Sequence, residues 1–527
     1  MFGQWRIADR STVLLWLGLF LLWNWRLASV TALNPEHIDR TEWLQLFGWK
    51  SAFFIALSLC LFAVFRKMRP TLLGVACFIV FWLLGGNLVA AVYAFDLLSF
   101  VLRLVMLGGA ILLVSYAIIK SFNMTALATA IYGGVVVGMQ APGVFSVLST
   151  HSLNQPLSGF EVDLDAISNE TRADEHLPHI IYIVPDRYAS NENLRSLYEY
   201  SNAPFTSELQ ARGFHVWDDQ YANYPKTFMS LASTLNADYL DPLTQRISRT
   251  STSYSYLNPS IRDFAARRAL QARGYSYTHV GAWWTPTKMN PLADRNFSDH
   301  RVPYGQLTQV YMRYTPLVFL LAQAEAQRTA CKVIDEKVEF IREQVQSDRP
   351  QFVFWHTLLT HDPYIFEDDG SCRSEKTDRI FARDYERRKQ AYLNHIEHFN
   401  RISLDLIDSV FQNSTRDVIL VIQSDEGPYP ESLILASNDL TPSSYNFLAA
   451  PRMEKQRKHG VFNAIYLPSQ DYEAARDLRS PVNNFRLIFR ELTDQPVRLL
   501  PDRVYSFEVD HQPYDLTDIS RDLELNE

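Results

Sequence analysis

The stretch IIYIVPDRY, residues 180–188, sets the fold class because it is an apolar, β-rich run that ends abruptly at Asp186. A second run of the same kind, VILVIQSDEGP at residues 418–428, ends in the adjacent acids Asp425 and Glu426. In an open α/β sheet the carboxyl ends of the strands lie along one edge, where ligands bind. The two runs therefore predict a sheet edge that carries three carboxylates.

Between and around these runs, strand-like and helical segments alternate. The strand-like segments are residues 180–184, 214–217, 275–280, 352–355, 418–422 and 462–467. The helical segments are residues 191–212, 227–235, 261–273, 316–347, 376–411 and 484–492. Such alternation predicts a mostly parallel sheet with helices on both faces, an α/β/α sandwich.

Thr227 opens a predicted helix within NYPKTFMSLASTLN, residues 223–236. A helix N-terminus offers free N–H groups and the positive end of the helix dipole, which suit an anionic substrate. Such a position also helps a hydroxyl to act as a nucleophile beside a metal. The alternative is an ordinary capping threonine, and Thr227 taken alone favours that alternative.

The acids also allow a functional and an ordinary interpretation. Asp186 is placed to bind a divalent cation, but Pro-Asp sequences also begin turns. Asp425 and Glu426 can both reach one cation, because Gly427 lets the backbone turn closely.

His356 and His361 follow the predicted strand at residues 352–355. Histidine at a strand end can bind a metal or donate to a phosphate oxygen. Each histidine taken alone is equally consistent with a hydrogen-bonded structural role.

The first 146 residues contain most of the long apolar runs. Five of them approach the length needed to cross a membrane: residues 12–32, 50–65, 71–94, 97–119 and 124–146. Basic residues precede the first run and separate the second from the third, which places the N-terminus in the cytoplasm and everything after about residue 147 outside. The first run also resembles a signal peptide, and the four remaining spans would give the same outward topology. We expect a five-span transmembrane domain at 1–146, a linker at 147–176, a catalytic domain at 177–505 and an acidic tail at 506–527.

Two of the four cysteines, Cys331 and Cys372, lie in the outer part of the chain. An oxidising compartment permits a disulfide between them, although two single cysteines do not determine the pairing. The net charge of −8 argues against nucleic acid as a partner.

The order of these motifs resembles that of the alkaline phosphatase superfamily. It comprises the first-strand aspartate, the helix-start threonine, the HDPY turn at 361–364 and the DEG turn at 425–427. The resemblance is closest to the membrane-anchored, sulfatase-like branch, which includes lipoteichoic acid synthases and the phosphoethanolamine transferases of lipid A. It covers most of residues 178–503, including the segments at 223–240 and 480–503, and residues 1–146 in architecture only.

The resemblance implies a role for each matching residue. Asp186 and Asp425 are expected to bind the metal, and Thr227 to be the metal-bound nucleophile that is transiently phosphorylated. His361 is expected to contact the phosphoryl oxygens or a second metal. His356 and Lys226 are expected to be further substrate contacts.

The chain departs from the family pattern at Glu426. Relatives usually carry a metal-binding histidine there, in the sequence Asp-His-Gly. A glutamate can still bind a metal, but it replaces a nitrogen ligand with an oxygen ligand. Oxygen ligands favour Mg²⁺, Mn²⁺ or Ca²⁺ over Zn²⁺. The Cys-x-Pro-x-Arg segment of true sulfatases is absent from the sequence, which argues against sulfate ester hydrolysis.

The function expected from the resemblance is that of a metal-dependent transferase in the bacterial inner membrane, with its catalytic domain in the periplasm or outside the cell. It would move phosphoethanolamine or phosphoglycerol from a phospholipid donor to an envelope glycan or lipid acceptor. Two alternatives stay open. One is a phosphatase-like or sulfatase-like hydrolase on the same scaffold, and the other is a catalytically degenerate protein that binds an envelope partner.

Overall fold

The computed structural model describes most of the chain. The described residues are 10–33, 40–93, 97–149, 177–245, 247–251, 254–297, 306–313, 315–317, 330–367, 369–372, 384–429, 445–493, 497–508 and 512–525. The chain divides into two compact units, one formed by residues 1–151 with 301–327 and the other by residues 152–300 with 328–527.

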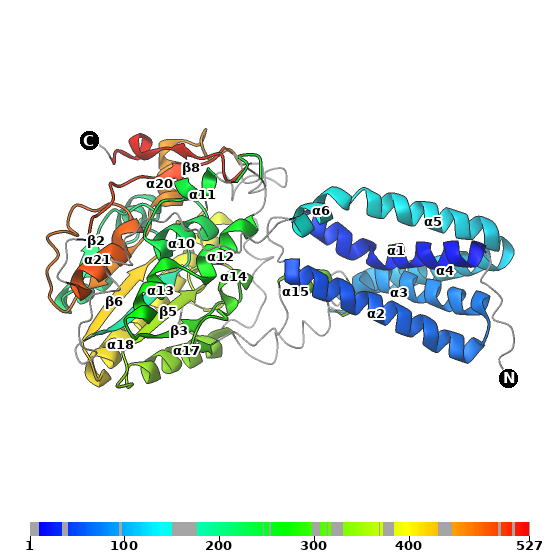
Figure 1. Cartoon of the computed structure of the whole chain (residues 1–527), viewed down its shortest axis with the longest axis horizontal. Helices are drawn as coiled ribbons and strands as arrows, with labels where there is room; N and C mark the ends of the chain where they lie inside the picture. Colours follow the sequence, from blue (N-terminus) through cyan, green and yellow to red (C-terminus); the bar gives the residue numbers. More distant parts are fainter. Residues whose placement is uncertain are drawn as a thin grey trace. The chain divides into compact units, whose positions relative to one another are not determined.

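The first unit is helical (Figure 1). Its helices are α1 (Arg10–Leu33), α2 (Arg40–Phe65), α3 (Met68–Tyr93), α4 (Leu97–Lys120), α5 (Phe122–Gly138), α6 (Ala141–Ser149) and α15 (Gln306–Arg313). Among the described residues, three helices are long and apolar enough to cross a membrane: Arg10–Ala32, Arg40–Phe65 and Leu102–Lys120. Two shorter apolar helices are Met68–Leu84 and Phe122–Gly138. The number of spans therefore stays an expectation.

Two of the predicted membrane segments have different limits in the structure. The second was predicted to begin at residue 50, whereas α2 begins at Arg40, with Arg40, Thr41 and Glu42 in its first turn. The fifth was predicted to run to residue 146, but it is interrupted between α5 and α6, before Pro142 at the start of α6. Proline is tolerated in the first turn of a helix and disfavoured in its interior.

The second unit contains a seven-stranded sheet, which confirms the predicted mixed α/β domain with a mostly parallel sheet. The strand order is β2-β7-β6-β1-β5-β3-β4. The strands are β1 (His179–Pro185), β2 (His215–Trp217), β3 (Ser276–Val280), β4 (Arg295–Phe297), β5 (Gln351–Thr357), β6 (Val418–Gln423) and β7 (Asn463–Tyr466). The pairs β6-β1, β1-β5, β5-β3 and β3-β4 are parallel, whereas β7 pairs antiparallel with both β6 and β2.

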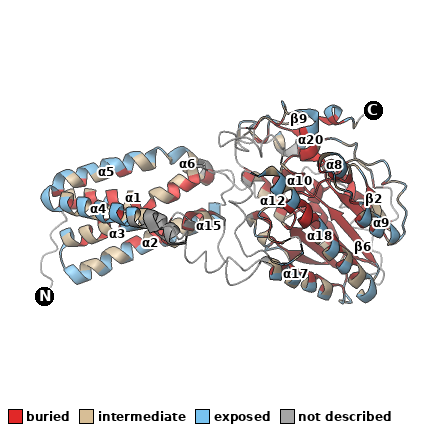
Figure 2. Ribbon diagram, turned by 180° about the vertical axis from the view of Figure 1, so that it is seen from behind, coloured by how far each residue is buried: buried red, intermediate tan, exposed pale blue. Residues whose placement is uncertain are grey.

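Helices cover both faces of this sheet. Alternate residues of β1 point to opposite sides, and each side contributes to a separate core that includes helix residues. Ile180, Tyr182 and Val184 belong to one core, and Ile181 and Ile183 belong to the other. The first core includes residues of α10 (Thr227–Asn236), α12 (Asn258–Arg262), α13 (Ala265–Ala272) and α21 (Asn484–Leu492). The second includes residues of α8 (Asn191–Leu197), α9 (Ala203–Ala211), α17 (Ala330–Gln344) and α18 (Tyr385–Asn413). Figure 2 shows the strands buried and the outer helix faces exposed.

The remaining short elements complete the unit. They are α11 (Asp241–Thr244), α14 (Thr285–Lys288), α20 (Arg452–His459), β8 (Tyr505–Ser506), β9 (Thr517–Asp518) and the 3-10 helices Tyr254–Leu257, Pro481–Asn483 and Ser520–Leu523. Val504, Ile519 and Leu523 are buried together. The described part of the expected acidic tail is therefore packed.

A disulfide joins Cys331 of α17 to Cys372, with their Cα atoms 6.0 Å apart. This separation lies within the usual range of disulfides. The pairing that the sequence left open is present in the second unit.

Candidate active site

The site lies at the carboxyl ends of the three central strands of the sheet. Asp186 directly follows β1, and Asp425 lies two residues beyond β6. His356 lies on β5, where it is paired in register with Val184. Because the three strands are parallel neighbours, they bring side chains that are far apart in the sequence to one edge.

Asp186, His356 and Asp425 form a buried cluster whose possible ligand atoms all lie within 4.8 Å of one another. Asp186 Oδ1, both carboxylate oxygens of Asp425 and Nε2 of His356 are buried without a hydrogen-bond partner. Buried polar atoms are normally satisfied, since leaving them unpaired is costly. A divalent cation would satisfy all four atoms, so the residues fit a metal site.

A hydrogen bond orients the ring of His356. Nδ1 of His356 lies 2.7 Å from Oγ1 of Thr287, and Nε2 lies 3.8 Å from Oδ2 of Asp186. A metal-binding histidine is usually fixed in this way through its second ring nitrogen. The ring of His356 is therefore oriented as that of a metal-binding histidine, whereas the resemblance suggested a substrate contact.

The charges of the cluster also favour a cation. Burial, followed by the charges of Asp425 and Glu426, raises the pKa of Asp186 well above its usual value. Burial and Glu426 raise the pKa of Asp425 to about 7. Clustered buried carboxylates resist ionisation unless a positive charge accompanies them.

Thr227 is the first residue of α10 and is partly exposed. Its backbone N–H donates to Oε2 of Glu426 at 3.0 Å. Its hydroxyl lies close enough to Asp425 to lower the pKa of that carboxyl, which partly offsets the effect of burial. Thr227 and the buried cluster therefore share one face of the domain.

Glu426 is surrounded by positive charge. Its Oε1 lies 2.9 Å from Nζ of Lys458 and 3.2 Å from Nε of Arg187. Burial acts to raise the pKa of Glu426, but Lys458, Arg187 and Lys226 outweigh it and hold the pKa at about 2. Both oxygens of this ionised carboxylate thus have partners, and Glu426 is placed outside the cluster formed with His356.

Arg187 and Lys458 are site residues that the sequence reasoning did not single out. Arg187 adopts a φ of 64°, a left-handed conformation that is uncommon for non-glycine residues. Its guanidinium lies 4.0 Å from the centre of the Tyr429 ring. Lys458 is buried in α20 and also donates to the carbonyl of Gly427 at 3.2 Å. The only sequence signal was the position of Arg187 directly after Asp186.

The other predicted substrate contacts lie around the cluster. His361 donates from Nδ1 to the carbonyl of Asp362, and burial followed by the charge of Arg187 lowers its pKa to about 4. Nζ of Lys226 lies 5.4 Å from the ring centre of Tyr429. The charge of Lys226 lowers the pKa of Glu426, and the charge of Glu426 in turn acts to raise the pKa of His361.

Gly427 is required where the turn formed by Asp425 and Glu426 packs against the end of α20. A Cβ atom at this position would collide with the carbonyl of Arg457, and the Gly427 N–H donates to the carbonyl of Lys458 at 2.8 Å. This close approach fixes the Asp425–Glu426 turn against the strand edge.

Comparison with solved structures finds matches of low sequence identity, with TM-scores of 0.40 or below. The periplasmic domain of EcEptC from Escherichia coli is 14% identical, with 65% of this chain and 92% of that chain covered and a TM-score of 0.40. The lipooligosaccharide phosphoethanolamine transferase EptA from Neisseria meningitidis is 14% identical, with 97% and 96% covered and a TM-score of 0.36. The lipoteichoic acid synthase LtaP from Listeria monocytogenes is 12% identical, with 67% and 81% covered and a TM-score of 0.36.

The family comparison is more specific. None of the curated proteins compared with the chain matches it. The family model named Sulfatase matches residues 178–477, which is more than half of the chain and includes the whole cluster described above. The chain therefore belongs to the sulfatase family of the alkaline phosphatase superfamily.

Proposed function

We propose that this protein is a membrane-anchored, metal-dependent transferase that uses Thr227 as its nucleophile. It takes a phosphoryl-linked head group, phosphoethanolamine or phosphoglycerol, from a phospholipid and moves it to an envelope glycan or lipid. The observation that carries the proposal is the buried cluster of unsatisfied ligand atoms beside a threonine at a helix N-terminus.

In this proposal Asp186, Asp425 and Thr227 hold the ion, and His356 takes the place expected for Glu426. When bound, the ion supplies a positive charge that favours ionisation of the threonine hydroxyl and neutralises the phosphoryl oxygens. An oxygen-only set would favour Mn²⁺ or Mg²⁺, whereas the histidine nitrogen also suits Zn²⁺. Activity is therefore to be compared with Mn²⁺, Mg²⁺ and Zn²⁺.

Two displacements transfer the group. Oγ of Thr227 forms a bond to phosphorus while the bond to the diacylglycerol oxygen breaks, and the proton lost by Thr227 is matched by the one that diacylglycerol gains. The acceptor hydroxyl then bonds to phosphorus while the threonine ester breaks, and one proton returns to Thr227. Lys226, beside Thr227 in the sequence, and His361 are proposed to contact the phosphoryl oxygens.

A membrane-embedded donor accounts for the first unit. The three long apolar helices would hold the enzyme in the bilayer that contains its phospholipid substrate. In the proposed topology the N-terminus is cytoplasmic and the catalytic domain lies outside the inner membrane, where the disulfide between Cys331 and Cys372 would persist.

The direct test is to trap the covalent intermediate. Purified full-length protein, loaded with Mn²⁺, Mg²⁺ or Zn²⁺ in turn, is incubated with phosphatidylethanolamine or phosphatidylglycerol and analysed by mass spectrometry. We expect a head-group adduct on Thr227. Thr227→Ala should abolish it and lower turnover at least about a thousandfold.

Ser230→Ala is the matched control. Ser230 is a buried hydroxyl residue in the same helix whose Oγ has no hydrogen-bond partner, so its removal should have little effect. An adduct on another residue, or an active Thr227→Ala enzyme, would refute the proposed nucleophile. Release of the head group to water in the presence of excess acceptor would indicate a hydrolase instead.

A further inference from the structure

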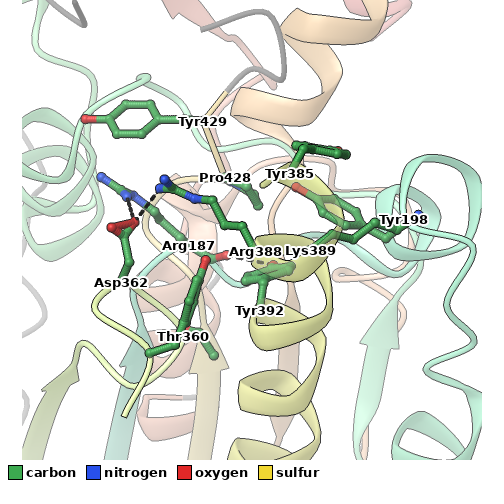
Figure 3. A pocket seen from close by; sticks show the side chains of 11 residues that line it. Arg187, Tyr198, Thr360, Asp362, Tyr385, Arg388, Lys389, Tyr392, Pro428 and Tyr429 are labelled. Atoms are coloured by element: carbon green, nitrogen blue, oxygen red, sulfur yellow. Dashed lines mark hydrogen bonds and ion pairs between the residues drawn. The ribbon is translucent and has the colours of Figure 1, made fainter. Parts of the chain in front are cut away.

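A pocket lies beside the candidate active site and is separated from it by Arg187. Its lining includes Thr360, Asp362 and Pro428, but not Thr227 or the residues of the buried cluster (Figure 3). Arg187 belongs to both places, since its Nε faces Glu426 and its Nη1 lies 3.2 Å from Oδ2 of Asp362. The pocket is therefore a neighbouring subsite and not the reaction centre.

The lining of this pocket carries more positive than negative charge. Arg187, Arg388 and Lys389 contribute cations, and Asp362 is the carboxylate among the lining residues. That carboxylate already serves two arginines, since Nη2 of Arg388 lies 2.8 Å from the same oxygen that Arg187 contacts. The pairing fixes both guanidinium groups, while Asp362 offsets only part of their charge.

The described surroundings add further carboxylates to this balance. Nε of Arg187 lies 3.2 Å from Oε1 of Glu426, which Lys458 shares, and 3.9 Å from Oδ1 of Asp186. The charge of Arg187 is therefore largely compensated, and Arg388 and Lys389 carry most of the positive charge of the pocket. Lys389 lies 3.9 Å from Glu199, whose side chain is 89% exposed. An exposed pair of this kind contributes little, because solvent screens it. The side chains of Arg388 and Lys389 are 23% and 17% exposed, so an entering anion can still reach them.

Five tyrosines also line the pocket: Tyr198, Tyr364, Tyr385, Tyr392 and Tyr429. Tyrosine combines a flat apolar face with a hydroxyl, so it can pack against a ring and remain compatible with polar groups. Arginine recognises phosphate and carboxylate through several parallel N–H donors. Cations together with tyrosine rings suit a molecule that has both an anionic group and a compact hydroxyl-bearing body.

We infer that this pocket binds an anionic sugar of the acceptor, that is, a sugar that carries a phosphate or a carboxylate. The inference rests on the proposed transfer reaction, in which the donor phosphate must lie at Thr227. A donor phospholipid with a single phosphate has no second anion for the neighbouring pocket. Arg187, between the two places, would hold the acceptor next to the loaded Thr227.

Binding measurements can test the pocket separately from turnover. Full-length metal-loaded protein in detergent is titrated calorimetrically with glucose 1-phosphate, glucose, inorganic phosphate and a short-chain phosphatidylethanolamine. We expect glucose 1-phosphate to bind more tightly than glucose or phosphate. Arg388→Gln and Lys389→Gln should each weaken its binding about tenfold, as expected for loss of a charge-assisted contact, and change lipid binding less than twofold.

Arg342→Gln is the matched control. Arg342, like Arg388, forms an ion pair with an aspartate (Asp405, at 2.6 Å), but it does not line the pocket. Equal weakening by Arg342→Gln would overturn the inference. Loss of lipid binding with unchanged sugar phosphate binding would assign the pocket to the donor and would also overturn it. The proposed function would be refuted by a different result, namely the absence of an adduct on Thr227. The binding titration does not measure that adduct, so the two tests are independent.

Discussion

Three cationic side chains, Lys458, Arg187 and Lys226, act on the carboxylate of Glu426. Turning this carboxylate toward a metal would leave the buried ammonium of Lys458 without its closest partner, which is costly in a protein interior. Glu426 also accepts the N–H of Thr227, and the N-cap residue Lys226 makes no side-chain capping hydrogen bond. We therefore expect Glu426 to position the start of α10 and His356 to complete the metal site.

This division of roles predicts that loss of His356 weakens metal binding far more than loss of Glu426. His356→Gln should weaken binding of Mn²⁺ or Zn²⁺ at least about tenfold, because it removes a ligand whose orientation is already fixed. Glu426→Gln combined with Lys458→Met removes the ion pair while keeping the charges balanced, and should change affinity less than about threefold. Calorimetric titration of metal-free full-length protein measures both. Metal loss in the double variant as severe as in His356→Gln would restore Glu426 as a ligand.

His179, at the start of β1, predicts how stability depends on pH. Burial, followed by the charge of Arg416, lowers its pKa from 6.5 to about 4. As the pH falls below about 6.5, the unfolded chain binds this proton before the folded chain does. The contribution of His179 to the stability of the folded chain is thus retained above about pH 6.5 and lost as the pH falls from about 6.5 to about 4.

The corresponding variant is His179→Asn, which keeps an acceptor near the Gln351 N–H that now donates to Nδ1 at 3.0 Å. The full linkage would amount to about 1.4 kcal/mol per pH unit. Melting temperatures measured at pH 7, 6 and 5 should fall less steeply in the variant. An equal or steeper fall would contradict the assignment.

The positions of some site residues could be predicted from the sequence, whereas the side-chain directions of others could not. Asp186 and Asp425 were predictable because each follows an apolar strand, and parallel strand ends share an edge. Thr227 was predictable as a helix start. The direction of the Arg187 side chain depends on a left-handed backbone, and that of His356 on the register of β5, so neither could be read from periodicity.

Among the elements, long apolar strands were predicted well and helix interruptions were not. The segment 191–212 was expected to be one helical stretch, but it forms α8 and α9 with Pro204 near the start of the second helix. Proline favours the first turn of a helix and disfavours its interior. The strand β4 was not predicted, because its three residues are exposed or only half-buried and lack an apolar pattern.

At the scale of the whole molecule, the chain does not divide linearly. Residues 301–327 belong to the first unit although they lie between two parts of the second. In that segment Leu307 and Tyr311 of α15 join a core with Leu27, Val30 and Trp43. The chain thus passes between the units after residues 151, 300 and 327. A pattern of apolar runs cannot reveal this arrangement, since α15 is short and its packing partners are distant in sequence.

The hydroxyl of Tyr311 is the polar centre of this packing. It accepts hydrogen bonds from Nζ of Lys50 and from Nε1 of Trp82 at 2.9 Å, and Lys50 is buried. Tyr311→Phe should therefore destabilise the first unit by about 1–3 kcal/mol, because it leaves buried donors with fewer acceptors. Tyr116→Phe is the matched control, since Tyr116 also accepts from a lysine, Lys120, but lies exposed on α4.

Thermal unfolding of the full chain in detergent should show a lower transition for Tyr311→Phe and almost none of this change for Tyr116→Phe. Protease should also cut within α15 sooner in Tyr311→Phe, because α15 packs against α1 and α2 of the first unit. If both variants melted alike and were cut at the same rate, the Tyr311 contact would not contribute to holding this segment.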